Sequence, residues 1–351
     1  MISSIISEIE MQSSFFSPPP FGGSREGITS IYFGGGTPSL LSTKDISNIL
    51  EATYEYFNIE EGVEITLEAN PDDLTSDKIL ELKSTCINRL SIGVQSFYDD
   101  HLKFLGRIHT ANEALTAIEK AQTAGFENLS VDLIYGIPGL TETQWKANID
   151  ILTKLNIPHI SCYSLTIEPR TALAKFVEKG TITLADEGES ISQFYYLIER
   201  LREKGYEHYE ISNFSKPGKR SLHNTGYWLG EAYLGIGPSA HSFNGTDRWA
   251  NVSNNVKYID LIRQGLFSGE VEPRNMNIRF NEYVMVSLRT QWGIDLKKVS
   301  LDFGEEYSAS ILSGIKSYMN SGLLIMDKQV ITLTNKGKIF ADRISSDLMR
   351  I

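Results

Sequence analysis

Segments typical of β-strands alternate with segments typical of α-helices through the middle of the chain, and this alternation is the strongest constraint on its fold. Most of the helical segments begin after a Ser or Thr that can cap them, at Ser42 or Thr43, Thr75 or Ser76, Thr110 and Thr141. The strand candidates cover residues 30–34, 63–69, 89–96, 128–136 and 159–165. Strands and helices in this order and at this spacing predict parallel βα units.

The first four strand candidates end in polar residues or in glycines. A glycine triplet, residues 34–36, follows the first strand, and Glu68, Gln95 and Asp132 stand at or near the ends of the next three. In parallel barrels and related folds the site lies at the carboxyl ends of the strands, where the βα loops meet. We therefore predict an α/β fold built on a partial parallel (β/α) barrel, with a polar site along this edge.

Composition and patterning divide the chain into three regions. Residues 1–27 are expected to form an N-terminal helix and a linker. Residues 28–250 are expected to form the partial barrel with an extension, which includes a long amphipathic helix after residue 185. Residues 277–351 combine helical segments with a late β-hairpin and predict a small, mainly helical, winged-helix-like C-terminal domain.

The charge balance argues against nucleic acid as the main partner. The chain carries 44 acidic and 33 basic residues, a net charge of -11, so it has no surplus of cations to neutralise phosphates. No apolar run is long enough to span a bilayer, and the N-terminus lacks the basic region of a secretion signal. Cys86 and Cys162 are the only cysteines, which is no disulfide framework. These features predict a cytoplasmic protein.

The glycine triplet has two interpretations. Bare backbone after a strand lets a ligand approach closely and leaves N–H groups free to bind it. A plain tight turn has the same sequence, and the segment alone does not decide between the two. Gly35, Gly36 and the hydroxyl of Thr37 are therefore candidate ligand contacts.

Three polar residues at strand ends form the second candidate group. Each of Glu68, Gln95 and Asp132 could simply be satisfied by a neighbouring loop, but three on one edge, with Arg107 just after the third strand, favour a polar ligand. A carboxylate can accept hydrogen bonds from an amine or a ribose hydroxyl. Arg107 can pair with a ligand carboxylate through two parallel hydrogen bonds.

The segment "HNTGYW", residues 223–228, places a histidine close to two aromatic residues. Imidazole is the usual protein ligand of haem iron, and aromatic rings can flank such a group. From these six residues alone, a loop histidine bonded to backbone is the better interpretation of His223. His241 is a second candidate, and Lys216, Lys219 and Arg220 form either a basic patch for porphyrin carboxylates or a solvated loop.

The remaining histidines and both cysteines are expected to be structural. His101, His109, His159 and His208 are scattered along the sequence and are interpreted as structural or exposed. An iron–sulfur cluster needs several thiolates, and the two cysteines lie far apart without a close-spaced partner. We expect Cys162, and Cys86 with it, to pack as small hydrophobic residues.

Together these segments resemble the radical S-adenosylmethionine proteins, in the branch that holds oxygen-independent coproporphyrinogen oxidase and the HemW-type haem chaperones. The resemblance runs from about residue 28 to the end of the chain, in the family's order and spacing. "HNTGYW" fits the chaperone branch better than the oxidase branch. The resemblance is carried by "IYFGGGTPSLL", "EANPDDLT", "NRLSIGVQSFYDDHLKFLGRIHT", "SVDLIYGIPGLT", "CYSLTIEPRT" and "EISNFSKPGKRSLHNTGYW".

The resemblance implies a role for each candidate residue. His223 would be the ligand of haem iron, and residues 277–351 would be a HemN-type C-terminal domain. S-adenosylmethionine would lie along the glycine turn, in a pocket completed by the residues at the strand ends. These S-adenosylmethionine contacts would be Gly35, Gly36, Thr37, Glu68, Gln95, Arg107 and Asp132.

One part of the family pattern is missing. The family opens with a strand that runs into Cys-x-x-x-Cys-x-x-Cys, whose thiolates hold a [4Fe–4S] cluster, whereas this chain starts at what would be the first helix and has no ligand for such a cluster. Either the protein starts upstream, or the chain has lost the cluster. We expect the former, because the other pocket residues remain intact.

Three functions follow from the resemblance. The leading one is a haem chaperone that holds haem through His223 and passes it to an acceptor protein, which the sequence does not identify. The second is an enzyme of the oxidase branch that decarboxylates coproporphyrinogen by radical chemistry. The third is a cluster-free scaffold that binds a nucleoside or a partner. Contact with a membrane is expected only through the acceptor.

Overall fold

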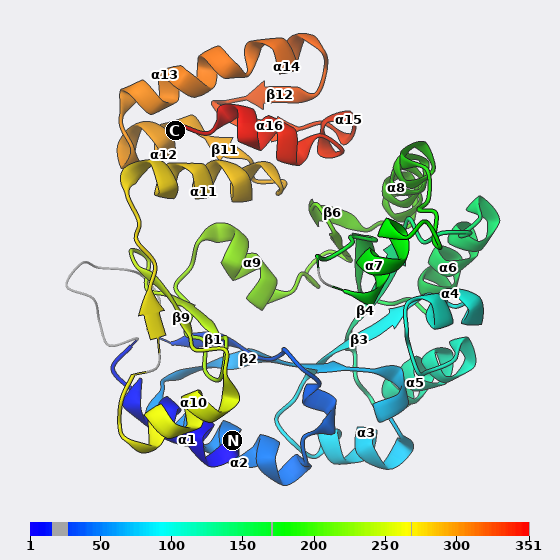
Figure 1. Cartoon of the computed structure of the whole chain (residues 1–351), viewed down its shortest axis with the longest axis vertical. Helices are drawn as coiled ribbons and strands as arrows, with labels where there is room; N and C mark the ends of the chain where they lie inside the picture. Colours follow the sequence, from blue (N-terminus) through cyan, green and yellow to red (C-terminus); the bar gives the residue numbers. More distant parts are fainter. Residues whose placement is uncertain (16–26, 170, 268, 351) are drawn as a thin grey trace.

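The computed structural model describes residues 1–15, 27–169, 171–267 and 269–350 (Figure 1). In this part of the chain the main sheet has seven strands in the order β1-β2-β3-β4-β5-β7-β6. The first five strands are parallel, and β7 and β6 continue the sheet in antiparallel fashion. The strands are β1 (Ile28–Phe33), β2 (Ile59–Ala69), β3 (Arg89–Gln95), β4 (Asn128–Tyr135), β5 (His159–Ser164), β6 (Glu207–Glu210) and β7 (Asn213–Ser215). The sheet forms a half-barrel, which confirms the predicted fold class.

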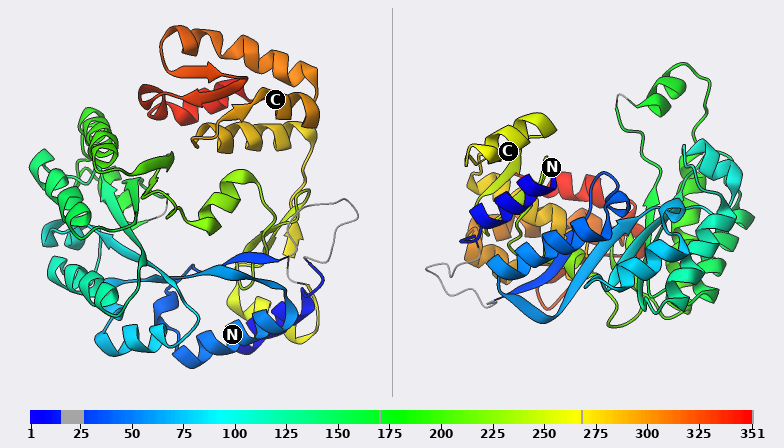
Figure 2. Two further views of the ribbon diagram at one scale, coloured as in Figure 1. Left: turned by 180° about the vertical axis from the view of Figure 1, so that it is seen from behind. Right: turned by 90° about the horizontal axis from the view of Figure 1, so that it is seen from below.

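Helices cover the convex side of this sheet (Figures 1 and 2). They are α2 (Thr43–Tyr56), α3 (Ser76–Lys83), α4 (Asp99–Phe104), α5 (Ala111–Thr123), α6 (Glu142–Lys154) and α8 (Glu187–Glu203). The predicted helix starts are confirmed, because the side chains of Ser42, Thr75, Thr110 and Thr141 each accept a backbone N–H of the first turn.

The two faces of the sheet differ in polarity. Leu67, Leu90, Val131 and Ile160 point to the helices and are buried in the main hydrophobic core. Alternate residues point to the concave face, because successive side chains of a strand lie on opposite sides. These are mostly polar and include Glu64, Thr66, Glu68, Arg89, Ser91, Gln95, Ser130, Asp132, His159 and Ser161. The half-barrel is therefore apolar outside, under its helices, and polar inside.

The N-terminal helix α1 (Ile2–Met11) packs against α2 and α10 (Asn255–Arg263). The carboxylate of its buried Glu8 accepts hydrogen bonds from the Gly237 N–H, the Asn251 amide and the Tyr258 hydroxyl, at 2.8, 2.6 and 2.5 Å. These bonds join the first helix to segments more than two hundred residues away. The linker expected within residues 1–27 falls largely on residues 16–26, which lie outside the described residues.

An extension follows the barrel strands and was not predicted in detail. It contains α7 (Ala172–Glu178), the helix α9 (Leu222–Leu229), α10, and an antiparallel sheet of β8 (His241–Phe243), β9 (Arg248–Asn251) and β10 (Gly269–Val271). Figure 1 shows α9 on the concave side of the main sheet, opposite the covering helices. The extension thereby places a helix against the polar face of the half-barrel.

The C-terminal region has its own hydrophobic core, around Phe280, Val284, Ile311 and Ile344. Its elements are α11 (Met276–Leu288), β11 (Ile294–Asp295), α12 (Leu296–Asp302), α13 (Glu305–Gly314), α14 (Lys316–Asn320), β12 (Leu324–Asp327), β13 (Val330–Leu333), α15 (Asn335–Lys338) and α16 (Ala341–Leu348). Helices and a late hairpin in this order agree with the winged-helix-like prediction. Among the described helices, none combines the length and the apolar character needed to cross a membrane.

Candidate functional site

The glycine turn after β1 has a backbone that only glycine adopts easily. Gly35 and Gly36 have φ of 75° and 62°, and no heavy atom lies within 4 Å of the place where a Cβ would stand. The turn is exposed, and Thr37 follows it at the start of a short 3₁₀ turn (Pro38–Leu40). The backbone here can lie directly against a ligand.

Glu68, near the end of β2, is held next to this turn. Its carboxylate accepts the Tyr32 hydroxyl at 2.7 Å and the Gly35 N–H at 3.1 Å. Tyr32 lies on β1, the neighbouring strand, so the two bonds fix the carboxylate between the strand end and the glycine turn. Two of the predicted groups, the turn and Glu68, are therefore in contact.

Gln95 and Arg107 lie on either side of the next strand end. Gln95 is buried and has φ of 69°, at an irregularity in the pairing of β3 with β4. Such backbone conformations in a residue other than glycine cluster at functional sites. Arg107 donates to the Asn70 side-chain oxygen at 3.4 Å, just beyond the end of β2.

Asp132 on β4 is close enough to Glu68 and Arg107 for their charges to affect its pKa. Burial raises its pKa to about 6, against the opposing effects of a hydrogen bond from Ser161 and of the positive charges of Arg89 and Arg107, while the charge of Glu68 adds to the rise. The charges of Glu68 and Arg107 both act on this carboxyl group. Asp132 therefore lies within electrostatic range of Glu68 and Arg107. The fourth candidate, Gln95, stands at the end of β3, the strand between β2 and β4.

His223 lies in helix α9, and not in a loop as its bare sequence suggested. The Ser221 hydroxyl caps the helix by accepting the Asn224 N–H, and Gly230 ends it in the left-handed conformation, with φ of 71°. The polar character of the segment hid this helix, because Asn, Thr and Gly in its first turns are weak helix formers.

The His223 ring faces strand β1 across the concave side of the sheet. Its Nδ1 lies 3.1 Å from the Ser30 hydroxyl, and its ring stacks on that of Tyr32, with centroids 4.7 Å apart and an interplanar angle of 16°. Its Nε2 lies 3.1 Å from the hydroxyl of Tyr227, one helical turn later. Burial, with the positive charge of Arg89, lowers the His223 pKa to about 4, so the imidazole is neutral at pH 7.

Polar contacts attach α9 to the sheet. Glu64 on β2 accepts the Ser221 hydroxyl at 3.3 Å and the His223 backbone N–H at 3.2 Å. Arg89 lies 3.8 Å from the other oxygen of Glu64, and both side chains are buried. The helix start that carries His223 is therefore fixed by a carboxylate of the barrel interior.

A chain of hydrogen-bonding groups runs from α9 across the concave face. The Asn224 amide donates to the Tyr209 hydroxyl at 3.1 Å, which lies 2.8 Å from Nε2 of His159. The chain continues through Ser130 and Ser161 to Asp132. Of this group, sequence reasoning singled out only Asp132 as a site residue, although polar residues at alternate positions of β3 and β4 signal a sheet with one polar face.

The other expectations for single residues have mixed outcomes. His241 is exposed, with 57% of its side chain accessible, and lies 3.7 Å from a Glu272 oxygen. His101 and His109 are buried and bonded to Ser96 and to the Val94 carbonyl, as structural residues should be.

The basic patch before His223 is mostly engaged by the protein itself. Arg220 pairs with Glu207 at 2.8 Å, and the Lys216 ammonium donates to the Lys204 carbonyl at 2.5 Å. Lys219 is exposed. Nothing in these contacts favours a patch for porphyrin carboxylates over a solvated loop.

The prediction for the cysteines is half right. Cys162 packs in the core on β5 with 1% of its surface accessible, as expected. Cys86 is exposed, because it lies in the loop between α3 and β3, where the neighbouring Ile87 occupies the core position instead. Across the described ranges, no group of three His, Cys, Asp or Glu side chains is placed to hold a metal ion.

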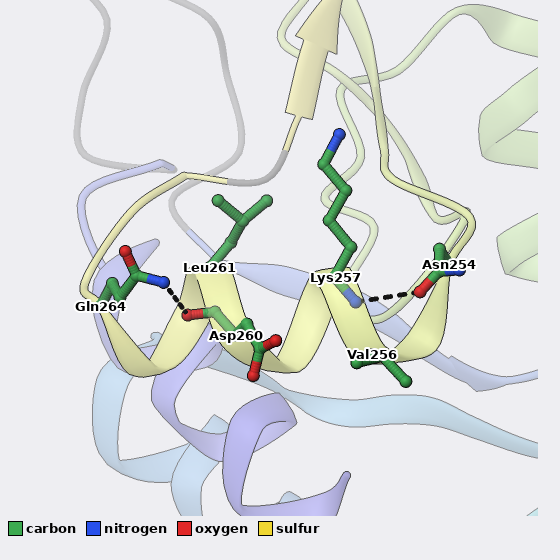
Figure 3. Close-up of a pocket in the computed structure, with 6 residues that line it drawn as sticks. All are labelled: Asn254, Val256, Lys257, Asp260, Leu261 and Gln264. Atoms are coloured by element: carbon green, nitrogen blue, oxygen red, sulfur yellow. Dashed lines mark hydrogen bonds between the residues drawn. The ribbon is translucent and has the colours of Figure 1, made fainter.

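Two hollows on the described part of the surface lie apart from the candidate site. One of about 540 Å³ lies along α10 and is lined by Asn254, Val256, Lys257, Asp260, Leu261 and Gln264 (Figure 3). Another of about 710 Å³ is lined by residues of β9 and β10 and of the segment that follows β9, and it reaches His241. None of the residues at the strand ends or on α9 lines either of them. Both are open surface features away from the concave face.

Comparison with known proteins finds relatives over most of the chain. The sequence matches the radical SAM superfamily over residues 22–152 and the HemN C-terminal domain over residues 279–340. Heme chaperone HemW of Bacillus subtilis (strain 168) is 33% identical over 319 residues, which cover 90% of this chain and 84% of that protein. Heme chaperone HemW of Lactococcus lactis subsp. lactis (strain IL1403) is 34% identical over 313 residues, 89% of this chain and 82% of that protein.

The fold is also similar to a solved structure. Coproporphyrinogen III oxidase (HemN) from Escherichia coli superimposes with a TM-score of 0.81 at 21% identity, over 99% of this chain and 82% of that chain. At this identity the likeness shows the fold alone. The sheet, the glycine turn and the matched domains define a radical SAM protein. Within that superfamily, the chain belongs to the family of the heme chaperone HemW.

Proposed function

We propose that this protein is a haem chaperone, which binds haem through His223 and transfers it to an acceptor protein. The observation that carries the proposal is a half-buried, neutral imidazole held against β1 by Ser30 and Tyr32, in a family of proteins named as haem chaperones. A neutral ring is required because a protonated nitrogen has no lone pair for iron. The acceptor is not identified, and the cytoplasm is the compartment that the sequence supports.

The contacts of His223 select the nitrogen that would bind iron. A histidine ligand usually donates its second ring N–H to a neighbouring group, which fixes the tautomer. Ser30 is a residue of β1, on the side of the ring that faces the sheet, and its hydroxyl can accept a hydrogen bond from Nδ1–H. Nε2 faces the Tyr227 hydroxyl, and Tyr227 is 44% exposed. We infer that Nε2 binds iron and that the Tyr227 hydroxyl occupies the position of the iron until haem arrives.

The strand-end residues fit S-adenosylmethionine. The open glycine turn, Gly35 and Gly36 with Thr37, would lie along the methionine end, and the carboxylates of Glu68 and Asp132 suit its amine and ribose hydroxyls. Gln95 and Arg107 would complete the pocket, with Arg107 pairing with the methionine carboxylate. In radical SAM proteins a [4Fe–4S] cluster reduces this cofactor. We assign binding to the residues of this chain, and no radical step.

Replacing His223 by Ala tests the proposal. We expect the wild-type protein, titrated with ferric haem, to give the Soret band of an imidazole complex, and the His223→Ala variant to lose that band or to bind haem at least tenfold more weakly. His241→Ala is the matched control, because His241 is exposed and lies outside the concave face. An unchanged spectrum and affinity in His223→Ala would refute the assignment.

A further inference from the structure

One side chain, Tyr32, touches both candidate sites. Its ring stacks on the ring of His223, 4.7 Å away, and its hydroxyl donates to Glu68 at 2.7 Å. Glu68 in turn accepts the N–H of Gly35 in the glycine turn. The candidate haem ligand and the candidate S-adenosylmethionine pocket are therefore separated by one ring and one hydrogen bond.

We propose that Tyr32 is a positioning residue shared by the two sites: it orients the His223 ring and the Glu68 carboxylate together, so that the two sites are energetically coupled. This inference rests on the proposed function of His223. It concerns residues that contact each other directly, so the coupling needs no long path through the protein.

The first glycine of the triplet gives independent support. Gly34 has no positive φ, so its backbone would accept other residues. A Cβ at this position, however, would lie 2.6 Å from the Tyr32 ring and 3.2 Å from the Glu68 carboxylate. Alanine would push both side chains out of place. Gly34 is thus required by the Tyr32–Glu68 pair, whereas Gly35 and Gly36 are required by the turn.

The Tyr32 hydroxyl and the Glu68 carboxylate form a lasting hydrogen bond. Burial and the charge of Glu68 raise the pKa of Tyr32 well above its ordinary value, so the phenol keeps its proton and donates to the carboxylate at all physiological pH. A hydrogen bond to a charged acceptor is stronger than one between neutral groups. The bond therefore holds the ring of Tyr32 in one orientation, and the stack transmits that orientation to the imidazole.

The coupling has a direction. Any ligand that holds Glu68 in its present place also holds Tyr32 and the His223 ring, and haem bound at Nε2 leaves the Ser30 and Tyr32 contacts intact. Occupancy of one site therefore favours the other, and by linkage the effect is reciprocal. Loss of the hydroxyl uncouples the sites, because the stacked ring is then no longer held in one orientation by Glu68.

A double-mutant cycle on haem binding tests this coupling. The variants are Tyr32→Phe, Glu68→Ala and their combination, with Gly34→Ala as a fourth. We expect each single substitution to weaken haem binding roughly fivefold, as for loss of one charged hydrogen bond, and the combination to be no weaker than either single variant. The electron paramagnetic resonance spectrum of the ferric haem should shift in all four, because it reports the orientation of the imidazole plane.

Tyr318→Phe is the matched control, because that hydroxyl also donates to a carboxylate, Asp347, in the C-terminal region. It should leave both the affinity and the spectrum unchanged. The coupling would be overturned if the two substitutions weakened haem binding independently, by about twenty-five-fold together in the double variant. It would also be overturned if Tyr32→Phe kept the wild-type spectrum. If His223→Ala kept the wild-type affinity for haem, the haem site itself would be refuted, so the two failures are distinguishable.

Discussion

At the scale of single residues, the two hydroxyls that contact the His223 ring should have opposite effects on haem binding. Tyr227→Phe removes the group that faces Nε2, so iron no longer competes with a hydrogen bond, and the affinity should rise about threefold to tenfold. Ser30→Ala removes the partner of Nδ1, so the ring loses its orientation and the affinity should fall by a similar factor. Titrations of both variants followed at the Soret band measure this. The opposite pattern would mean that Nδ1 binds the iron.

The sequence identified individual site residues better than it identified their partners. His223, Glu68 and Asp132 became candidates because their types are unusual at strand ends or beside aromatic residues, and as site residues they stay predictions. Ser30 and Tyr32 were not found, since a serine and a tyrosine in a strand carry no signal of what they face. Their contact with His223 joins positions 193 residues apart, and that proximity is created by the fold and not by local sequence.

At the scale of elements, one buried carboxylate contributes the polar contacts of α1, which also packs through Ile9 against an apolar cluster with α2. Glu8→Ala would leave the Gly237 N–H and the Tyr258 hydroxyl without their acceptor, and the Asn251 amide would keep only its bond to the Gly237 carbonyl. Unsatisfied buried donors are costly, so we expect a loss of about 2–4 kcal/mol in the free energy of unfolding. Urea denaturation followed by circular dichroism measures it.

Glu51→Ala is the control for this prediction, because Glu51 is exposed on α2 and should change stability by less than about 0.5 kcal/mol. Equal stability of the Glu8 and Glu51 variants would show that α1 contributes little to the fold.

Elements with strong local signals were predicted, and those without them were not. Ser and Thr caps fixed the starts of four covering helices, and apolar runs fixed the five parallel strands. Helix α9 and the sheet β8-β9-β10 were missed, because the first is rich in weak helix formers and the strands of the second are three or four residues long. Such short segments form because tertiary contacts hold them, which local propensity cannot report.

At the scale of the whole molecule, the two larger of the three hydrophobic clusters among the described residues predict two cooperative units. Phe280 is fully buried in the C-terminal core and packs on Phe303 and Tyr307, at centroid distances of 5.5 and 4.8 Å. Phe280→Ala should destabilise this core by about 3–5 kcal/mol. Differential scanning calorimetry should then show the C-terminal unit melting before the half-barrel.

The complementary variant, Phe126→Ala, removes a buried ring from the core of the half-barrel. It should lower the melting temperature of the larger unit. If both variants melt in one transition, the two cores unfold together and the division into units is wrong.

The polar attachment of α9 has a consequence for how the protein releases its cargo. None of the described side chains of this helix is fully buried, and its first turn is held by Glu64, Ser30 and Tyr32 and not by packed hydrocarbon. Lifting α9 away from the sheet breaks these polar contacts and removes no fully buried side chain, so the core of the half-barrel stays intact. A protein that grips the exposed side of α9 can therefore draw the helix and its ligand outward by local opening, while the half-barrel stays folded behind it.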